Sequence, residues 1–143
     1  MTSPSAWYDA YPKPRHESPS QISREELLER IRNGQKAGID FILIDLRRND
    51  HEGPTIKGSI NLPAQTLYSS LSTLLNLCTK AKIDTVIWYC GSSRGRGSRA
   101  AVWFADLVED SGVDGISSLA LTGGITGWVQ AGEEYGDLMD GKV

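Results

Sequence analysis

Residues 85–99 read TVIWYCGSSRGRGSR and contain the parts of one strand–loop–helix unit. The first five residues form a nearly continuous apolar run, which is typical of a strand buried on both faces. The run ends at Cys90, a loop with three glycines follows, and helical spacing of apolar residues extends from Ser98 to Asp110. This order predicts that Cys90 lies at the carboxyl end of a strand, where α/β proteins bind their ligands.

Strand and helix patterns alternate through the rest of the chain. Apolar runs predict strands at 41–44, 59–63 and 116–121, and residues 67–80 and 125–131 have helical spacing. A further helix begins at Ser23, whose capping-box partner is Glu26, and ends near Gly34, with Ile22 and Leu27 on its apolar side. This alternation predicts an α/β fold in which helices flank a mainly parallel central sheet.

The chain divides into a short arm and one domain. Residues 1–20 contain four of the six prolines together with Trp7, Tyr8 and Tyr11. We expect an extended Pro-rich N-terminal arm, attached to the domain by these aromatic residues. Residues 21–143 are long enough for one domain with a substantial core.

The composition argues against several classes of function. A net charge of −3 gives no electrostatic basis for nucleic-acid binding. No apolar run approaches the ~20 residues of a membrane span, and no secretory signal is present in the first twenty residues. Two cysteines provide neither a disulfide framework nor a zinc site. We therefore expect a cytoplasmic protein without bound metal, in which a free reactive thiol persists.

The residues around Cys90 suggest a nucleophile in an anion-binding loop. A glycine-rich loop before a helix turns backbone N–H groups inward, and the helix dipole adds partial positive charge, so such a loop binds anions. The same field favours thiolate over thiol, which makes Cys90 a candidate nucleophile near neutral pH. The candidate oxyanion-binding loop consists of Gly91, Ser92, Ser93, Arg94, Gly95 and Gly97.

Arg96 completes the candidate catalytic pair. Five residues separate it from Cys90, and a guanidinium can bind two oxygens of a tetrahedral oxyanion at once, which a lysine cannot. The alternative interpretation is a buried structural cysteine followed by a basic connector. Arg94 either attracts the anion or is merely solvated, and Arg99 is expected on the surface or in an ion pair.

Two further reactive residues are expected to be structural. Cys78 lies on the apolar side of the helix predicted at 67–80, so we interpret it as a core residue and not as a second redox thiol. Asp45 follows a buried strand, and it either acts as a general acid or holds the neighbouring Arg47.

Three collinear motifs beside the cysteine loop resemble those of the rhodanese-like superfamily. Asp45-Leu46-Arg47 resembles the family's Asp-x-Arg. Residues 55–63, TIKGSINLP, resemble its His-Ile-x-Gly-Ala/Ser-x-Asn-Ile/Leu-Pro segment, with threonine in place of histidine. Residues 121–128, LTGGITGW, resemble its closing Gly-Gly-x-x-x-Trp signature. The resemblance covers about residues 20–135 and implies a rhodanese-like domain.

The length of the cysteine loop separates reactions within that superfamily. Its sulfurtransferases typically have a loop one residue shorter, whereas its cell-cycle phosphatases and eukaryotic arsenate reductases have Cys-x5-Arg. The sequence matches the longer loop, and Arg96-Gly97 resembles the Arg-Gly of the reductases. Tyr89 departs from the histidine that commonly precedes the cysteine in the longer-loop enzymes.

The resemblance implies arsenate reduction through a thiol–arsenate adduct on Cys90, in a protein similar to the fungal arsenate reductases. Glutathione or a glutaredoxin would supply the electrons, and no cofactor is bound. The alternatives, in order, are a protein-tyrosine-phosphatase-like phosphatase, for which the sequence identifies no general acid, a thiosulfate sulfurtransferase, and a non-catalytic rhodanese module that binds a protein. The expected ligand is a small oxyanion, arsenate or a phosphate ester.

Overall fold

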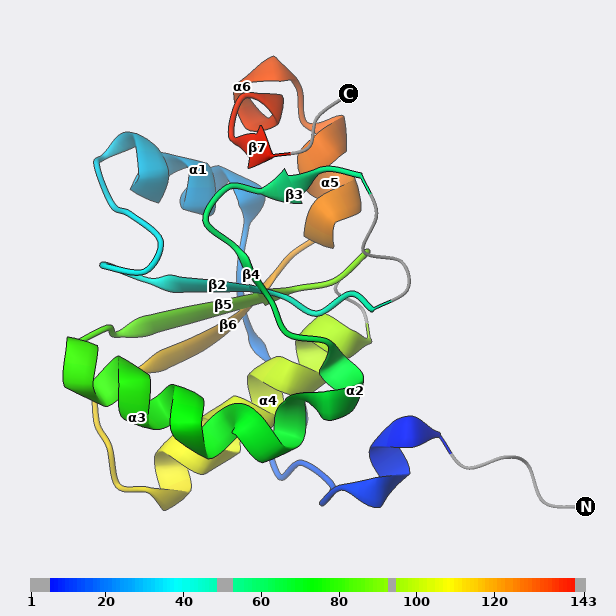
Figure 1. Cartoon of the computed structure of the whole chain (residues 1–143), viewed down its shortest axis with the longest axis vertical. Helices are drawn as coiled ribbons and strands as arrows, with labels where there is room; N and C mark the ends of the chain where they lie inside the picture. The colour runs from blue at the N-terminus through cyan, green and yellow to red at the C-terminus, as the bar shows by residue number, and fades with distance from the viewer. Residues whose placement is uncertain (1–5, 49–52, 93–94, 141–143) are drawn as a thin grey trace, which may run out of the picture.

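A five-stranded parallel sheet forms the centre of the molecule (Figure 1). The computed structural model describes residues 6–48, 53–92 and 95–140. The strand order is β1-β6-β5-β2-β4, and all four neighbouring pairs are parallel. The strands are β1 (Ser20–Ile22), β2 (Ile42–Asp45), β4 (Ile60–Asn61), β5 (Thr85–Tyr89) and β6 (Ser117–Leu121). β5 is the middle strand, so its carboxyl end lies at the centre of the row formed by the carboxyl ends of the five parallel strands.

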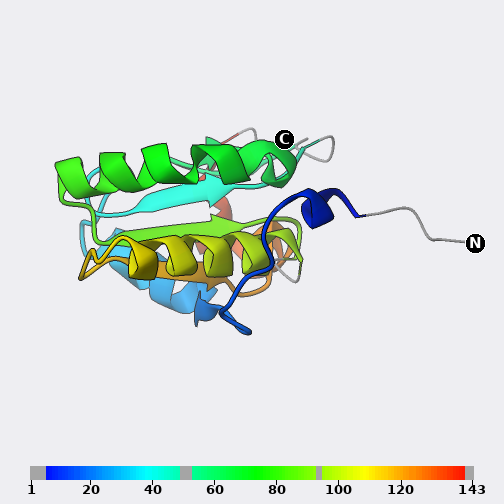
Figure 2. The ribbon, with the colours of Figure 1, turned by 90° about the horizontal axis from the view of Figure 1, so that it is seen from below.

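Helices cover both faces of the sheet (Figures 1 and 2). One face carries α1 (Arg24–Arg32), α5 (Gly124–Gln130) and α6 (Glu133–Gly136). The other carries α2 (Ala64–Leu67), the 3₁₀ helix η2 (Tyr68–Ser70), α3 (Leu71–Ala81) and α4 (Arg96–Asp110). A small antiparallel pair joins β3 (Thr55–Ile56) to β7 (Met139–Asp140), and a 3₁₀ helix, η1 (Trp7–Ala10), lies in the N-terminal arm.

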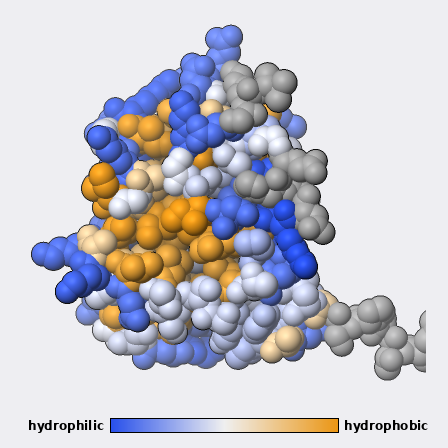
Figure 3. Space-filling model, viewed as in Figure 1, coloured by the Kyte–Doolittle hydropathy of each residue, from blue (hydrophilic) through white to orange (hydrophobic). Residues whose placement is uncertain are grey.

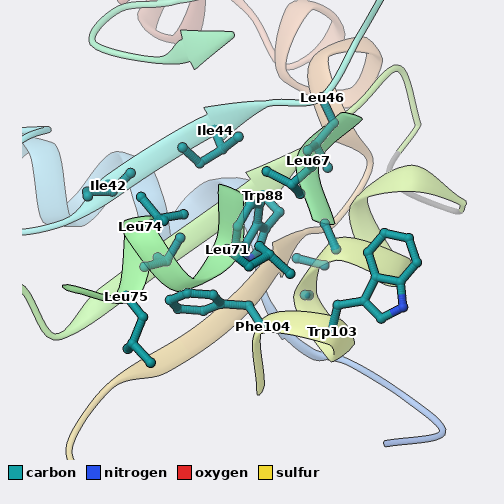
Figure 4. Close-up of a cluster of buried hydrophobic side chains, with 14 of the residues drawn as sticks. Ile42, Ile44, Leu46, Leu67, Leu71, Leu74, Leu75, Trp88, Trp103 and Phe104 are labelled. Carbon is teal, nitrogen blue, oxygen red and sulfur yellow. The ribbon is translucent and has the colours of Figure 1, made fainter. Parts of the chain in front are cut away.

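Two apolar clusters hold the layers together, one on each face of the sheet. Side chains alternate along a strand, so Trp88 packs toward α3 and α4 while Ile87 and Tyr89 pack in the opposite cluster. Figure 4 shows the first cluster, in which Trp88 meets Phe104 of α4. Cys90 belongs to this same cluster. Alternation along β5 therefore places Cys90 on the α4 side of the sheet.

Apolar residues also reach the surface on one side of the molecule. Figure 3 shows apolar side chains across the middle of the face that Figure 1 presents. Ile60 of the edge strand β4 and Leu77 of α3 are 48% and 59% exposed. None of the helices in the described residues is long and apolar enough to cross a membrane.

The α/β fold predicted from the sequence is confirmed. The sequence did not predict β3, β7 and α6, nor η1 within the arm that was expected to be extended. The bounds of three predicted elements also differ. Ile22 lies in β1 and not on the first helix, because Ser23 is the N-cap of α1. The helix predicted at 67–80 begins at Ala64 and passes through η2 before α3. The helix predicted from Ser98 begins at Arg96, so Arg96 and Gly97 lie in its first turn.

Candidate functional site

Three elements meet at Cys90. β5 ends one residue before it, α4 begins six residues after it, and α5 begins at Gly124 beside it. Cys90 is 3% exposed, so only a small part of this residue is accessible to solvent. We use the name Cys90 loop for residues 90–96, of which Ser93 and Arg94 lie outside the described residues.

α5 fixes the first part of the Cys90 loop through its own N-terminus. The Ile125 N–H donates to the Cys90 carbonyl and the Thr126 N–H donates to the Gly91 carbonyl, each at 3.0 Å. These two bonds use N–H groups that a helix cannot satisfy internally. They hold the backbone on which the Cys90 thiol is mounted.

Gly124 makes this approach possible. A Cβ atom at this position would lie 2.4 Å from the Cys90 carbonyl oxygen and 2.6 Å from that of Gly91. The residue also has a φ of +56°, in the left-handed region that favours glycine. The Gly-Gly pair found in the sequence therefore has a steric function at the candidate site.

Arg96 lies on the other side of the loop. A Cβ atom built on Gly91 would be 4.0 Å from Nη2 of Arg96, so the guanidinium extends back across the start of the loop. Gly95 is the N-cap of α4 and brings no side-chain oxygen to this helix end. Gly97 is buried in the first turn, and Ser92 is exposed. The structure thus places the Arg96 guanidinium beside Gly91, the residue after Cys90, with the positive end of the α4 dipole at the other end of the loop.

Asp45 forms a buried ion pair with Arg47. Nε and Nη2 of Arg47 donate to the Asp45 carboxylate at 3.1 and 2.8 Å, and the Arg47 backbone N–H donates to it at 3.0 Å. Arg47 also donates to the carbonyl of Pro54 at 3.2 Å. The structural interpretation of Asp45 is therefore confirmed: it holds Arg47 and the loop after β2.

Tyr89 points away from the candidate site. Its hydroxyl accepts a hydrogen bond from the Ile56 N–H at 3.3 Å and donates to Oγ of Ser59 at 3.0 Å. Burial raises the pKa of this phenol well above its usual value, so it remains neutral. Because residues 89 and 90 face opposite sides of the sheet, the tyrosine occupies the layer opposite the Cys90 side chain.

Cys78 is a core residue, as the sequence indicated. It is fully buried on α3 among apolar side chains, and burial raises the pKa of its thiol. A thiol in such surroundings is a poor nucleophile. Within the described residues, no group of three His, Cys, Asp or Glu side chains is arranged to hold a metal ion.

The N-terminal arm contacts α4. The sequence predicted an aromatic attachment of the arm but not the helix to which it attaches. Nε1 of Trp103 donates to the Pro12 carbonyl at 3.2 Å, and the Tyr11 hydroxyl donates to the Gln65 carbonyl at 3.1 Å. Tyr11 also meets Trp103 edge to face, with their ring centroids 5.7 Å apart. The expected aromatic attachment of the arm is present in these contacts.

Charged contacts extend the attachment along α4. The backbone N–H groups of Arg15 and His16 donate to the Asp106 carboxylate at 2.8 and 3.2 Å. Partial burial acts to raise the pKa of Asp106, but the bonds from Arg15 and His16 outweigh it and lower that pKa. The Asp106 carboxylate is therefore held in its charged form against the arm.

Arg99 joins the arm to the start of α4. Its guanidinium carbon lies 3.4 Å from the centroid of the Tyr8 ring and 5.9 Å from that of Trp7. These distances fit cation–π contacts. The sequence predicted a surface or ion-pairing residue, and no local signal could have identified a ring 91 positions earlier as its contact.

Comparison with solved structures supports the fold. The chain is similar to an As-Sb reductase from Leishmania major, with a TM-score of 0.72 and 24% identity over 85% of this chain and 84% of that one. It is also similar to yeast Ygr203w, described as a protein tyrosine phosphatase of the rhodanese family, with a TM-score of 0.63 and 21% identity over 87% and 93% of the two chains. At these identities the likeness shows the fold alone.

A sulfurtransferase has the same fold as well. Thiosulfate sulfurtransferase from Pseudomonas aeruginosa matches with a TM-score of 0.57 and 20% identity, over 87% of this chain but only 21% of the larger protein. No curated protein sequence matched the chain. The family model for the rhodanese-like domain matches residues 23–131, which include both β5 and the Cys90 loop. With this match over most of its length, the chain belongs to the rhodanese-like domain family.

Proposed function

We propose that the protein is a cysteine-dependent enzyme that acts on a small tetrahedral oxyanion, and that this reaction is arsenate reduction. Cys90 is the nucleophile and Arg96 binds the oxyanion. One observation carries the proposal: Cys90 lies between the N-termini of two helices. The N-terminus of α5 holds the backbone of Cys90, and α4 begins with Arg96. Positive charge on that side attracts an anion to the position beside the Cys90 sulfur.

The proposed reaction begins with displacement at arsenic. The Cys90 sulfur attacks arsenate, an As–S bond forms, and one oxygen leaves as water. An external thiol then attacks the Cys90 sulfur, so that a disulfide forms and the As–S electron pair reduces As(V) to As(III), which leaves as arsenite. A second donor thiol reduces the disulfide and restores Cys90. Two thiols are oxidised to one disulfide for each arsenate reduced.

The thiols must come from outside the domain, since Cys78 is buried in the core. We propose glutathione or a glutaredoxin as the donor, in the reducing cytoplasm. No bound cofactor takes part in this scheme.

Arsenate is preferred over a phosphate ester because of the leaving group. Hydrolysis of a phosphate ester is helped by an acid that protonates the departing oxygen. Asp45, the acidic residue at the end of the neighbouring strand, is fully buried and bound to Arg47. In arsenate the departing group is one of its own hydroxyls, which takes a proton from solvent and leaves as water, so a dedicated acid is less important than for an ester.

A parallel assay with three substrates tests the proposal. We expect the purified full-length protein to consume arsenate in the presence of glutathione, glutaredoxin and a reductase. Cys90→Ser should abolish this turnover, whereas Cys78→Ala should keep it, since the latter change removes only a buried core thiol.

The same assay contains the outcomes that oppose the proposal. Hydrolysis of an aryl phosphate without arsenate turnover would make the protein a phosphatase. Sulfur transfer from thiosulfate to cyanide alone would make it a sulfurtransferase. Turnover of none of the three would favour a non-catalytic module that binds a partner.

A further inference from the structure

A large groove lies between the N-terminal arm and the first half of α4. Its volume is about 870 Å³, and it reaches Gly95, the residue before Arg96. The groove therefore adjoins the Cys90 loop. Its α4 side is formed by Gly95, Ser98, Arg99, Val102 and Trp103, and its arm side by residues from Tyr8 to Glu17.

The contacts that hold the arm make this groove a built part of the fold. The bond from Trp103 to the Pro12 carbonyl and the bonds from Arg15 and His16 to Asp106 attach the arm at two separate points along α4. The Tyr11 ring stacks on Tyr68 with a centroid distance of 5.1 Å, which adds a contact to η2.

The groove beside the loop has aromatic and cationic walls. The half-buried Tyr8 ring lies against the Arg99 guanidinium, and Tyr11 and Trp103 add further ring surface. Planar rings and a guanidinium bind aromatic groups well, through edge and face contacts and cation–π attraction. Arg99 is also three residues after Arg96, so both positive charges belong to the first turns of one helix.

A bare oxyanion such as arsenate needs only the Cys90 loop and leaves this groove unused. We propose that the groove binds the aromatic ring of an aryl oxyanion, an aryl phosphate or arylarsonate, whose tetrahedral head group lies at Cys90 and Arg96. Tyr8 and Arg99 determine this specificity. The inference rests on the proposed function in one respect, the binding of the oxyanion head group at Cys90 and Arg96.

A smaller hollow on the other side of the loop is a poorer site for such a ring. Its volume is about 330 Å³, and its described lining includes Arg47, Ile125 and Val129 but no aromatic side chain. Arg47 is already bound to Asp45 and Pro54. This hollow supplies the control for the experiment.

Calorimetric binding of phenyl phosphate and methyl phosphate to the full-length Cys90→Ser protein tests the inference. The two ligands share a head group and differ in the ring, and loss of the thiol prevents turnover. We expect phenyl phosphate to bind about tenfold more tightly. Adding Tyr8→Ala should reduce the preference to about twofold or less, while Tyr8→Phe, which keeps the ring, should preserve it.

The controls separate failure of the groove from failure of the loop. Val129→Ala, in the smaller hollow, should leave the preference for phenyl phosphate unchanged. If Val129→Ala removes this preference and Tyr8→Ala does not, the ring lies in the smaller hollow and the inference is overturned. Equal binding of phenyl phosphate and methyl phosphate in every variant would show that the groove does not bind the ring, while the site at Cys90 would still bind an anion. If neither ligand nor inorganic arsenate binds, the proposed function fails together with the inference.

Discussion

Two helices begin at the Cys90 loop, and their N-termini differ in what they face. At α5, the N–H groups of Ile125 and Thr126 are bonded to the carbonyls of Cys90 and Gly91. At α4, the N-cap is a glycine without a side-chain oxygen, and the first residue is the candidate anion ligand Arg96. One helix end is used to hold the protein's own backbone, while the other lies on the side proposed for the substrate.

The difference explains why two glycine-rich motifs flank the same cysteine. The glycine at 124 allows α5 to approach the loop backbone closely. The glycines at 91, 95 and 97 belong to the loop and the first turn of α4, where small residues leave room for an anion. A rigid support on one side permits an open anion site on the other, and changes on the two sides should therefore have different effects.

The largest effect on stability is expected on the α5 side. Gly124→Ala would place a Cβ 2.4 Å from the Cys90 carbonyl oxygen, at a left-handed backbone position. We expect the free energy of unfolding to fall by about 3 kcal/mol, from backbone strain and overpacking together. Urea unfolding followed by circular dichroism measures it, and turnover should be lost as the loop backbone is displaced.

Gly127→Ala is the matched control in the same helix. Its Cβ would meet only ordinary contacts, at 3.7 Å from Nη1 of Arg24 and 3.8 Å from the Thr122 carbonyl oxygen. Alanine also favours the helix by up to about 1 kcal/mol over glycine, so this variant should be as stable as the wild type or more so. Equal stability of the Gly124→Ala and Gly127→Ala proteins would show that α5 does not support the loop.

An intermediate effect is expected on the α4 side, and on binding instead of stability. Arg96→Lys keeps the charge but removes the two-pronged contact, so affinity for arsenate should fall about tenfold. The circular dichroism spectrum should not change. Calorimetric titration measures the affinity, with Arg32→Lys on the opposite layer as control; unchanged affinity would mean that Arg96 does not bind the anion.

The smallest effect concerns the arm that α4 holds. Trp103→Phe keeps an aromatic ring but loses the N–H that donates to the Pro12 carbonyl at 3.2 Å. The net value of such a bond is about 1 kcal/mol, so tryptic cleavage after Arg15 should accelerate about fivefold. Tyr68→Phe, which keeps its ring contact with Tyr11, should not alter the rate. No difference between these two variants would argue against the bond from Trp103.

Locally encoded elements could be predicted from the sequence. Oγ of Ser23 accepts from the Glu26 N–H at 3.1 Å, and the Glu26 carboxylate accepts from the Ser23 N–H at 3.2 Å, as the capping-box spacing indicated. β2 and β5 follow their apolar runs because strands in the middle of a parallel sheet are buried on both faces.

Elements that depend on distant partners could not be predicted. β1 has only three residues and exists through pairing with β6, almost a hundred positions later. The change from α2 to η2 interrupts a continuous helical pattern that contains no glycine or proline. In both cases the local sequence is too short or too uniform to predict the element.

The same division applies to the candidate site. The spacing of Cys90 and Arg96 is local, and the structure places them on the same loop. The bonds from Ile125 and Thr126 come from a helix more than thirty positions later, so the sequence showed the Gly-Gly motif but not its role. The contact of Arg99 with Tyr8 is equally distant and depends on the path of the arm.

The complete burial of Cys78 has a further consequence. Cys78 is fully enclosed by α3 and its neighbours, and its thiol is held in the neutral form by burial. A thiol reagent reaches such a side chain only when the surrounding segment opens. When the segment opens and closes faster than the reagent reacts, the rate of modification of Cys78 depends on the free energy of that opening. The native chain thus contains a natural probe of local unfolding in the layer formed by α3 and α4, separate from the chemistry at Cys90.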